Sequence, residues 1–327
     1  MNNKDNYIPR LPVEIVLNSK FGTEINDLDG HKFYELESEI VARKDENIII
    51  HLKKAFIPFS FYTLSSNQKN NKLDIIETQT GGTTNTYVIT IPDGNYNITE
   101  LLSTITTLLE SETQFNYKYS ITFNSINGKV SFLITSGTNA LNSTLLFSSG
   151  SNVSNSCNRL LGFNNTDITF TTSSSATSQK VIDMADGLDS LHIKSNLVGQ
   201  NTSGTVGDTG SSELLVIPID LQPYNILYYD EGAEPFKHKI SQSSIKRIEI
   251  KITNSRDKIV DFNGLPYTFI LLAQFVFNPS STLTIMNKSI DSEQALLARI
   301  ATNNELADKI LKKINNNNIN EDSGKAK

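Results

Sequence analysis

The run SSIKRIEIKIT at residues 243–253 alternates apolar and charged side chains. Ile248, Ile250 and Ile252 share one face, and charged residues occupy the other. This period of two is typical of a strand with one buried face. Similar short runs recur between turn residues, without the strand–helix–strand rhythm of a parallel sheet. The pattern therefore predicts a mainly β chain, with an antiparallel sandwich or jelly roll of roughly eight strands outside a central unit.

Two further runs are expected to be strands of this scaffold. YTFILLAQFVF at 267–277 is apolar on both faces, as a central buried strand would be. It is too short to cross a membrane as a helix. NIIIHLKKAFIPFSF at 47–61 alternates from Ile48 to Leu52, and Pro58 is expected to end or bend the strand.

The central unit carries one sharply defined helix signal. In IPDGNYNITELLSTITTLLE, residues 91–110, Asn97 is a good N-cap, and Glu100 stands three residues later as in a capping box. Asn127-Gly128 separates two alternating runs within 118–135, which predicts a hairpin. Six apolar residues share one face of the helix: Ile98, Leu101, Leu102, Ile105, Leu108 and Leu109. The unit is therefore interpreted as a β–α–β–β domain with its own core.

These patterns divide the chain into five parts. We expect an N-terminal arm over 1–30, the first part of the jelly roll over 31–72, an inserted domain over 73–180, the second part of the jelly roll over 181–285, and a C-terminal helix with a disordered tail over 286–327.

Three segments have more specific expectations. TTSSSATSQK at 171–180 is interpreted as a low-complexity linker, and 199–212 as a flexible loop. Residues 292–314 keep helical spacing and carry favourable i,i+4 ion pairs. We expect this C-terminal helix, and the arm over 1–20, to become ordered only on assembly.

Composition narrows the function classes. Of 327 residues, 20% are charged, and the net charge of −6 disfavours a broad basic surface for nucleic acid, although a local basic patch is compatible with it. A single cysteine, Cys157, excludes an intrachain disulfide. The first residues contain no apolar stretch of the kind that a signal peptide needs. The chain is therefore expected to be cytosolic, nuclear or assembled from the cytosol.

Candidate metal ligands and catalytic residues are scattered. His31, His51, His192 and His238 show no metal-binding spacing, so each is interpreted as structural. Two acidic segments have a metal-site reading and a turn reading, and the turn is favoured for both. They are YYDEGAEPFKHK at 228–239, with Asp230, Glu231, Glu234 and His238, and DMADGLDS at 183–190, with Asp183, Asp186 and Asp189.

Nucleophile and phosphate motifs are also missing. No G-x-S-x-G occurs, and Cys157 has no partner signature, so a buried thiol is the favoured reading. Gly81-Gly82 lacks a following helix, and the helix after Asp93-Gly94 already uses its free amides in the cap. No catalytic, cofactor-binding or metal-binding residue is assigned, and we expect no enzyme activity and no cofactor.

Six segments follow one another in a fixed order along the chain. They are IPDGNYNITELLSTI (91–105), ITFNSINGKVSFLI (121–134), NRLLGF (158–163), DGLDSLHIKSNLVGQ (186–200), ELLVIPID (213–220) and IKRIEIKITNSRDKIVDFNGLPYTFILLAQF (245–275). This ordered series resembles penton (minor capsid) proteins of virophages and polinton-like viruses, and the resemblance covers most of residues 30–280.

The resemblance implies a single jelly roll with an inserted domain, assembled as a homopentamer at icosahedral vertices of the virion. It implies contact with a double-jelly-roll major capsid protein, synthesis in the host cytoplasm, and no catalytic residues. The C-terminal segment 292–314 departs from what the resemblance leads us to expect.

Two alternatives stay open at this point. One is a receptor- or glycan-binding spike or fibre-like module, which would take a host or giant-virus surface receptor as its partner. An exposed aromatic patch at Phe115, Tyr117 and Tyr119 would favour it. The other is a jelly-roll enzyme, which would need His192 or His238 beside an acid such as Asp230. No membrane span and no specific nucleic-acid partner are predicted.

Overall fold

The structure is a computed structural model that describes residues 8–25, 28–112, 114–198, 212–232 and 235–277, together with Lys309. The chain divides into two compact units. The first comprises 1–10, 42–47 and 275–327, most of which lies outside the described residues. The second comprises 11–41 and 48–274 and contains nearly all of the sheets. The protein is mainly β, with one long helix among the described residues.

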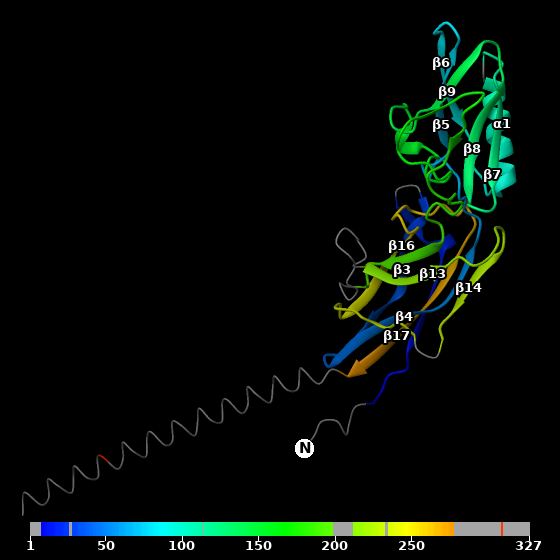
Figure 1. The fold of residues 1–327 in the computed structure, drawn as a ribbon. Helices are drawn as coiled ribbons and strands as arrows, with labels where there is room; N and C mark the ends of the chain where they lie inside the picture. The colour runs from blue at the N-terminus through cyan, green and yellow to red at the C-terminus, as the bar shows by residue number, and fades with distance from the viewer. Residues whose placement is uncertain are drawn as a thin grey trace, which may run out of the picture. The chain divides into compact units, whose positions relative to one another are not determined.

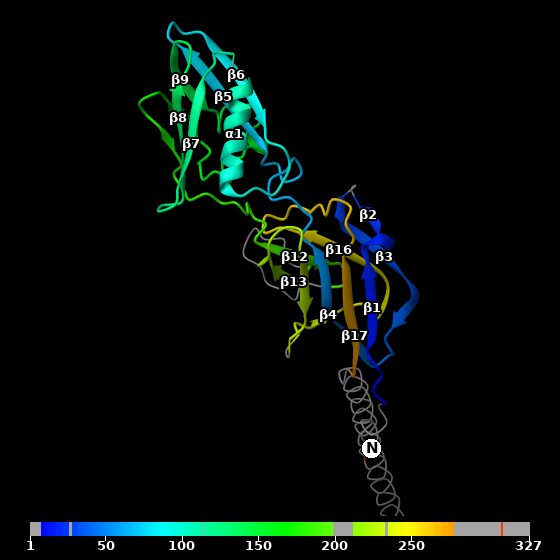
Figure 2. The ribbon, with the colours of Figure 1, turned by 90° about the vertical axis from the view of Figure 1, so that its right-hand side faces the viewer.

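Two five-stranded sheets form the scaffold (Figures 1 and 2). The first sheet has the order β1 (Val13–Asn18), β17 (Thr268–Phe277), β4 (Glu46–Pro58) and β14 (Ile226–Asp230), and β15 (His238–Lys239) also pairs with β4. The second sheet has the order β13 (Glu213–Pro218), β12 (Ser190–Ser195), β16 (Ser244–Thr253), β3 (Leu28–Val41) and β2 (Thr23–Ile25). The strand pairs with a recorded register are antiparallel, as the sequence predicted.

Alternation decides which side of each strand is buried. On β16, Ile248, Ile250 and Ile252 are fully buried, while the charged residues between them are at least partly exposed. On β4, Ile48 and Ile50 are fully buried in the same way. The pattern predicted for β16 is confirmed. On β4 the buried face at Ile48 and Ile50 is confirmed, but His51 on the opposite face is buried as well. These rows of branched side chains supply the apolar core of the scaffold.

Strand β17 is only partly as predicted. It lies between β1 and β4, which confirms its central position. Phe269 and Leu271 are fully buried, but Ile270 and Leu272 on the other face are only half-buried. The expected burial on both faces is therefore wrong for the described structure, because only one face of this sheet is covered by core.

The N-terminal segment contains two short strands. Val13–Asn18 forms β1, which pairs antiparallel with β17 through Val13–Ala273 to Asn18–Thr268. Thr23–Ile25 pairs with β3 in the other sheet. The expectation that 1–20 becomes ordered only on assembly is thus wrong for β1, because its buried residues Ile15 and Leu17 supply part of the core. Residues 1–7 lie outside the described residues.

The inserted segment has a four-stranded and a three-stranded sheet. Their orders are β10 (Ile168–Phe170), β9 (Ala140–Leu145), β5 (Lys72–Gln79), β6 (Thr84–Thr90), and β11 (Ala176–Thr177), β8 (Lys129–Ser136), β7 (Lys118–Asn124). Helix α1 (Ile98–Glu112) follows β6. Short 3-10 turns are η2 (Ser19–Phe21) and η3 (Val153–Asn155). The predicted order of strand, helix and hairpin is confirmed, and β9, β10 and β11 are additional strands.

The start of α1 is as its sequence predicts. Asn97 Oδ1 accepts a hydrogen bond from the Glu100 amide at 2.9 Å, and Glu100 Oε2 accepts one from the Asn97 amide at 3.1 Å. This is the reciprocal capping box. The hairpin is also confirmed, because Gly128 has a φ of +69° at the turn that joins β7 to β8.

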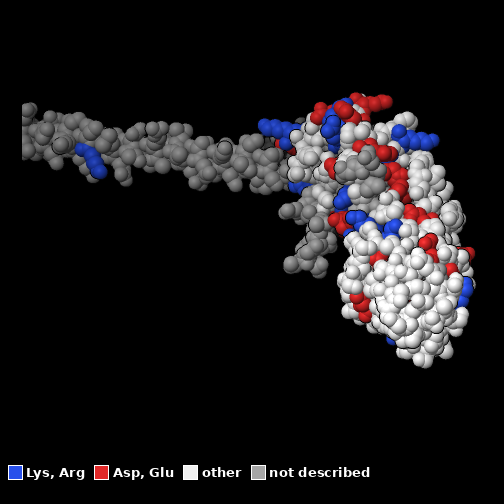
Figure 3. All heavy atoms as spheres, turned by 90° about the horizontal axis from the view of Figure 1, so that it is seen from above, with Lys and Arg blue, Asp and Glu red and all other residues white. Residues whose placement is uncertain are grey.

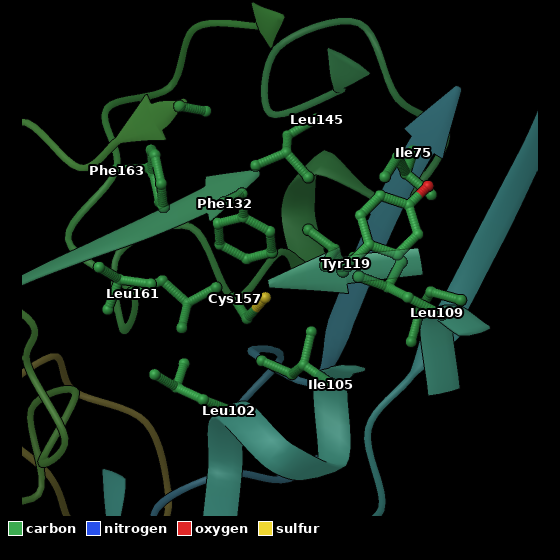
Figure 4. Packing of buried hydrophobic residues seen from close by; sticks show 14 of the residues in the cluster. Ile75, Leu102, Ile105, Leu109, Tyr119, Phe132, Leu145, Cys157, Leu161 and Phe163 are labelled. Atoms are coloured by element: carbon green, nitrogen blue, oxygen red, sulfur yellow. The ribbon is translucent and has the colours of Figure 1, made fainter. Parts of the chain in front are cut away.

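The inserted segment has a separate apolar cluster, whose members all lie between residues 64 and 176. Figure 4 shows Leu102, Ile105 and Leu109 of α1 pointing toward Phe132 and Tyr119 of the small sheet. Aromatic rings contribute strongly, since Phe132 contacts Phe163 and Phe170 with ring centroids about 6 Å apart. The helix therefore packs on a sheet, as the apolar stripe predicted.

Residues 171–180 are not a free linker. Ala176 and Thr177 form β11, paired with Phe132 and Ser131 of β8. Ser178 is buried, and its hydroxyl accepts a hydrogen bond from the Val130 amide at 3.1 Å. The expectation is wrong because serine and threonine hydroxyls satisfy backbone groups here, so a polar composition does not mean an unpaired chain.

Other expectations fall on residues that are not described. The flexible loop at 199–212 lies outside the described residues except for Ser212, and the C-terminal helix at 292–314 lies outside them except for Lys309.

We predict that Asn97→Ala lowers the free energy of unfolding by about 1 kcal/mol, because the cap of α1 loses its acceptor. The measurement is urea unfolding followed by circular dichroism. Ser103→Ala, on the exposed face of the same helix, is the matched control and should leave stability unchanged or slightly raised. Equal destabilisation by both variants would contradict the role of the cap.

Candidate functional site

One face of the first sheet exposes large apolar side chains. We call this the outer apolar face and define it by Val16 of β1, Ile270 of β17, Phe56 of β4, and Ile226 and Tyr228 of β14. The exposed fractions are 62% for Val16, 40% for Phe56, 65% for Ile226 and 52% for Tyr228. Ile270 is half-buried. Single exposed apolar residues are ordinary, but a group on adjacent strands marks an interaction surface.

The strand register places four of these residues in two cross-strand pairs. Val16 pairs with Ile270, and Phe56 pairs with Tyr228, whose ring lies 5.2 Å from the Phe56 ring. The strands are adjacent in the order β1, β17, β4, β14. Each residue alternates with a neighbour in the core, so a period of two directs all of them away from that core.

Charged residues of both signs lie on the same face. Lys53 Nζ on β4 contacts Glu14 Oε1 on β1, reaching across β17. Lys54 Nζ lies 3.5 Å from Asp230 Oδ2, which also accepts a hydrogen bond from the Tyr228 hydroxyl at 2.7 Å. That hydrogen bond, with the Lys54 charge, holds the pKa of Asp230 below its usual value. The carboxylate therefore stays ionised on this face at neutral pH.

The outer face of the second sheet carries mainly charged side chains, unlike the outer apolar face of the first. His31 Nε2 lies 2.7 Å from Glu249 Oε1, and the Arg247 guanidinium lies over the Phe33 ring at 4.7 Å. Lys194 Nζ lies 2.8 Å from Asp257 Oδ1. Several of its charged side chains are paired within the chain, whereas Val16, Ile226 and Tyr228 of the first sheet are more than half exposed.

Each of the four histidines contacts a different partner. Besides His31, His51 is buried with Nε2 2.7 Å from Glu231 Oε2, and His192 Nδ1 contacts Glu213 Oε1. His238 Nε2 lies 2.8 Å from the Leu214 carbonyl oxygen. In the described part of the chain, no three His, Cys, Asp or Glu side chains lie close enough together to hold a metal ion.

The acidic segment at 228–239 does not form one cluster. Asp230 contacts Lys54 and Tyr228, whereas Glu231 contacts His51. Glu234 lies outside the described residues.

Only two of the three aspartates in the acidic segment at 183–190 share a binding partner. Asp183 and Asp186 both contact the Arg256 guanidinium, which the sequence reading did not connect to them. Asp186 also accepts a hydrogen bond from Asn70 Nδ2 at 2.6 Å. Asp189 Oδ1 instead accepts one from the Ser190 hydroxyl at 3.1 Å. The pair therefore anchors the chain around Arg256.

Cys157 and Asp93, considered above as possible parts of a catalytic or phosphate site, have structural roles. Cys157 is fully buried, and burial raises the pKa of its thiol to about 12, so it is protonated at neutral pH. Asp93 accepts hydrogen bonds from the Ser66 amide and from Asn71 Nδ2.

The aromatic residues proposed for a glycan-binding patch belong to the core. Tyr117 and Tyr119 are buried, and Phe115 is packed against the same apolar cluster. The Tyr117 hydroxyl donates to the Thr78 carbonyl oxygen at 2.6 Å. The exposed patch that would have favoured the glycan-binding reading is therefore not formed by these residues.

One end of the inserted segment is free of charge. Residues 78–92 and 133–158 contain no Lys, Arg, Asp or Glu. Figure 3, which looks down on the β6 and β9 end of Figure 1, shows that end almost entirely as uncharged atoms. The charges of this segment are therefore concentrated elsewhere.

Comparisons with known proteins do not show a family for this chain. No protein-family model and no curated protein matches the sequence. Among solved structures, the chain is similar to the crystal structure of the selenomethionine-labelled mavirus penton protein, with a TM-score of 0.43 and 12% identity over 81% of this chain and 100% of that chain. A TM-score of 0.43 is too low to transfer a fold or a function. No helix among the described residues is long and apolar enough to cross a membrane.

We predict that the folded chain loses stability as the pH falls from 7.5 to 5, in part through His51. Burial lowers the pKa of His51 below 6.5, and Glu231 opposes this only partly, while Lys237 and Lys53 add to it. The unfolded chain therefore takes up a proton at a higher pH than the folded chain does. The stabilisation is complete above the unfolded pKa and is lost as the pH falls below it.

The measurement is the free energy of unfolding in urea at several pH values. His51→Gln should flatten the slope between pH 7.5 and 5, and His192→Gln, at a partly exposed imidazole, should retain the His51 contribution. An unchanged slope in His51→Gln would show that His51 does not titrate as described.

Proposed function

We propose that the chain is a structural minor capsid (penton) protein, a single jelly roll with an inserted domain, that occupies icosahedral vertices of a virion as a homopentamer. In this proposal it contacts a double-jelly-roll major capsid protein, is made in the host cytoplasm and has no enzyme activity. Two antiparallel sheets with an insert between β4 and β12 suit this architecture. The ordered series of sequence segments supports the same family.

The outer apolar face is the observation that carries the proposal. Val16 on β1, and Ile226 and Tyr228 on β14 at the other side of the same sheet, are more than half exposed. Covering apolar surface contributes roughly 25 cal/mol for each Å² removed from water. The ion pair Glu14–Lys53 crosses this face over β17, and Asp230–Lys54 lies on its β14 side; both can orient a neighbour.

A second copy of the chain is the occupant we propose for this face. A five-membered ring is closed by contacts between two different surfaces of each copy. The outer apolar face would form one side of each contact, and a different surface of the neighbour the other.

A receptor- or glycan-binding spike is the alternative function. Its expected site at Phe115, Tyr117 and Tyr119 is packed in the core of the insert. Without an exposed aromatic patch there, the assembly role has the stronger structural support.

We predict that the purified chain forms pentamers with a mass near five times 36.3 kDa as its concentration rises. The measurement is light scattering across a concentration series. Ile226→Lys and Val16→Lys should each raise the concentration needed for assembly at least about tenfold, because each places a charge where an apolar contact forms.

Val88→Lys is the matched control, since Val88 is a similarly exposed apolar residue on β6 of the insert. It should assemble like the unaltered chain. A stable trimer, or a monomer at every concentration, would contradict the homopentamer. Equal assembly of all variants would contradict the assigned face.

A further inference from the structure

A basic cavity of about 430 Å³ lies beside the turn at residues 153–165. Its cations are Lys69, Arg159 and Lys180, and its described lining contains no Asp or Glu. Ser154, Asn158 and Asn165 add hydroxyl and amide groups. The whole chain has a net charge of −6, so this concentration of positive charge is local.

The positive charge of the cavity is only partly neutralised by the described residues. Arg159 Nε lies 3.8 Å from Asp186 Oδ1, and Arg256 contacts both Asp186 and Asp183, so two carboxylates face these two guanidinium groups. Lys69 and Lys180 have no ion pair or side-chain hydrogen bond among the described residues, and theirs is the charge that stays unpaired.

The pKa of Lys258 also reflects the excess of positive charge near the cavity. Burial, together with the nearby cations Arg159, Arg256 and Lys69, lowers the pKa of Lys258 to about 8. Neighbouring cations disfavour one another's charged forms, so an anion bound among them would relieve this repulsion.

The walls of the cavity are held in place by the backbone. The Phe163 amide donates to the Asn158 carbonyl oxygen at 2.7 Å, and the Lys180 amide donates to the Gly162 carbonyl oxygen at 2.8 Å. Gly162 has a φ of +81°, and a Cβ there would lie 2.5 Å from the Lys180 carbonyl oxygen. Only glycine allows this close approach, which fixes the backbone of Lys180 beside the turn.

We propose that this cavity binds a small acidic saccharide. Lys69, Arg159 and Lys180 hold its carboxylate or sulfate group, and Ser154, Asn158 and Asn165 meet its hydroxyl groups. The volume suits a ligand of one or two sugar rings. A nucleic-acid strand is disfavoured, because such a site tracks a backbone with exposed aromatic rings for stacking, and the only aromatic residue of this lining, Phe163, is buried.

This inference depends on the lining of the cavity in the insert, and it is independent of the proposed capsid role. Failure to bind a saccharide would leave the assembly proposal intact, and failure to assemble would leave the cavity proposal intact. The two are tested by separate variants.

The test is isothermal titration calorimetry of the full chain with four probes: the monosaccharide sialic acid, a sulfated N-acetylglucosamine, neutral lactose and inorganic sulfate. We expect the two acidic sugars to bind at one site, with lactose and sulfate each at least about tenfold weaker. Binding should weaken as the salt concentration rises, because partly exposed charges are screened.

Two variants locate the site. Lys69→Gln and Lys180→Gln should each weaken binding of the acidic sugars about tenfold, since each removes one charge-assisted contact. Lys118→Gln is the control, because it makes the same charge change on β7 of the insert, at a residue that does not line the cavity. Melting temperatures of the three variants check that each is folded.

Three results would overturn the proposal. Sulfate that binds as tightly as the acidic sugars would mean an anion site without saccharide recognition. Binding that is unchanged in Lys69→Gln and Lys180→Gln would place the ligand elsewhere. No binding by either acidic sugar at millimolar concentration would leave the cavity without the proposed ligand.

Discussion

Burial of alternate side chains on β4, β16 and β17 is the constraint on which the scaffold depends. Ile48, Ile250 and Leu271 are fully buried, one from each of these strands. Because successive strand residues point to opposite faces, fixing the core also fixes what each sheet presents outside. The second sheet presents ion pairs such as Lys194–Asp257, while the first presents Val16, Ile226 and Tyr228 more than half exposed beside ion pairs of its own.

This asymmetry links the fold to the proposed function. A monomer gains nothing from exposing Ile226 and Val16, whereas an assembled chain gains apolar burial at each contact. The same sheet is extended at its edge by β1, so the N-terminal segment is part of the scaffold. The insert builds its core separately, between residues 64 and 176, and it holds the basic cavity near Lys180.

Local signals predicted most of the elements. Asn97 and Glu100 fixed the start of α1, and Asn127-Gly128 fixed the hairpin, because capping and turn chemistry involve only nearby residues. Strand β11 was missed because hydroxyl side chains made 171–180 look like a linker. The pairing of its Ala176 with Phe132 is a contact between residues far apart in the sequence, which composition does not reveal.

The candidate sites were less predictable, because they too depend on contacts between residues far apart in the sequence. The outer apolar face needs the register that places Phe56 beside Tyr228, and the cavity needs Lys69 and Lys180 to meet across more than 100 residues. No pattern in the sequence connected Arg256 to Asp183 and Asp186.

Hydroxyl-radical footprinting of the chain across its assembly range tests the central claim most directly. Oxidation of Phe56 and Tyr228 is expected to fall as copies associate, while oxidation of the exposed Phe123 on β7 of the insert stays constant. Unchanged oxidation of Phe56 and Tyr228 in a sample shown to be assembled would contradict the claim that the outer apolar face lies between copies.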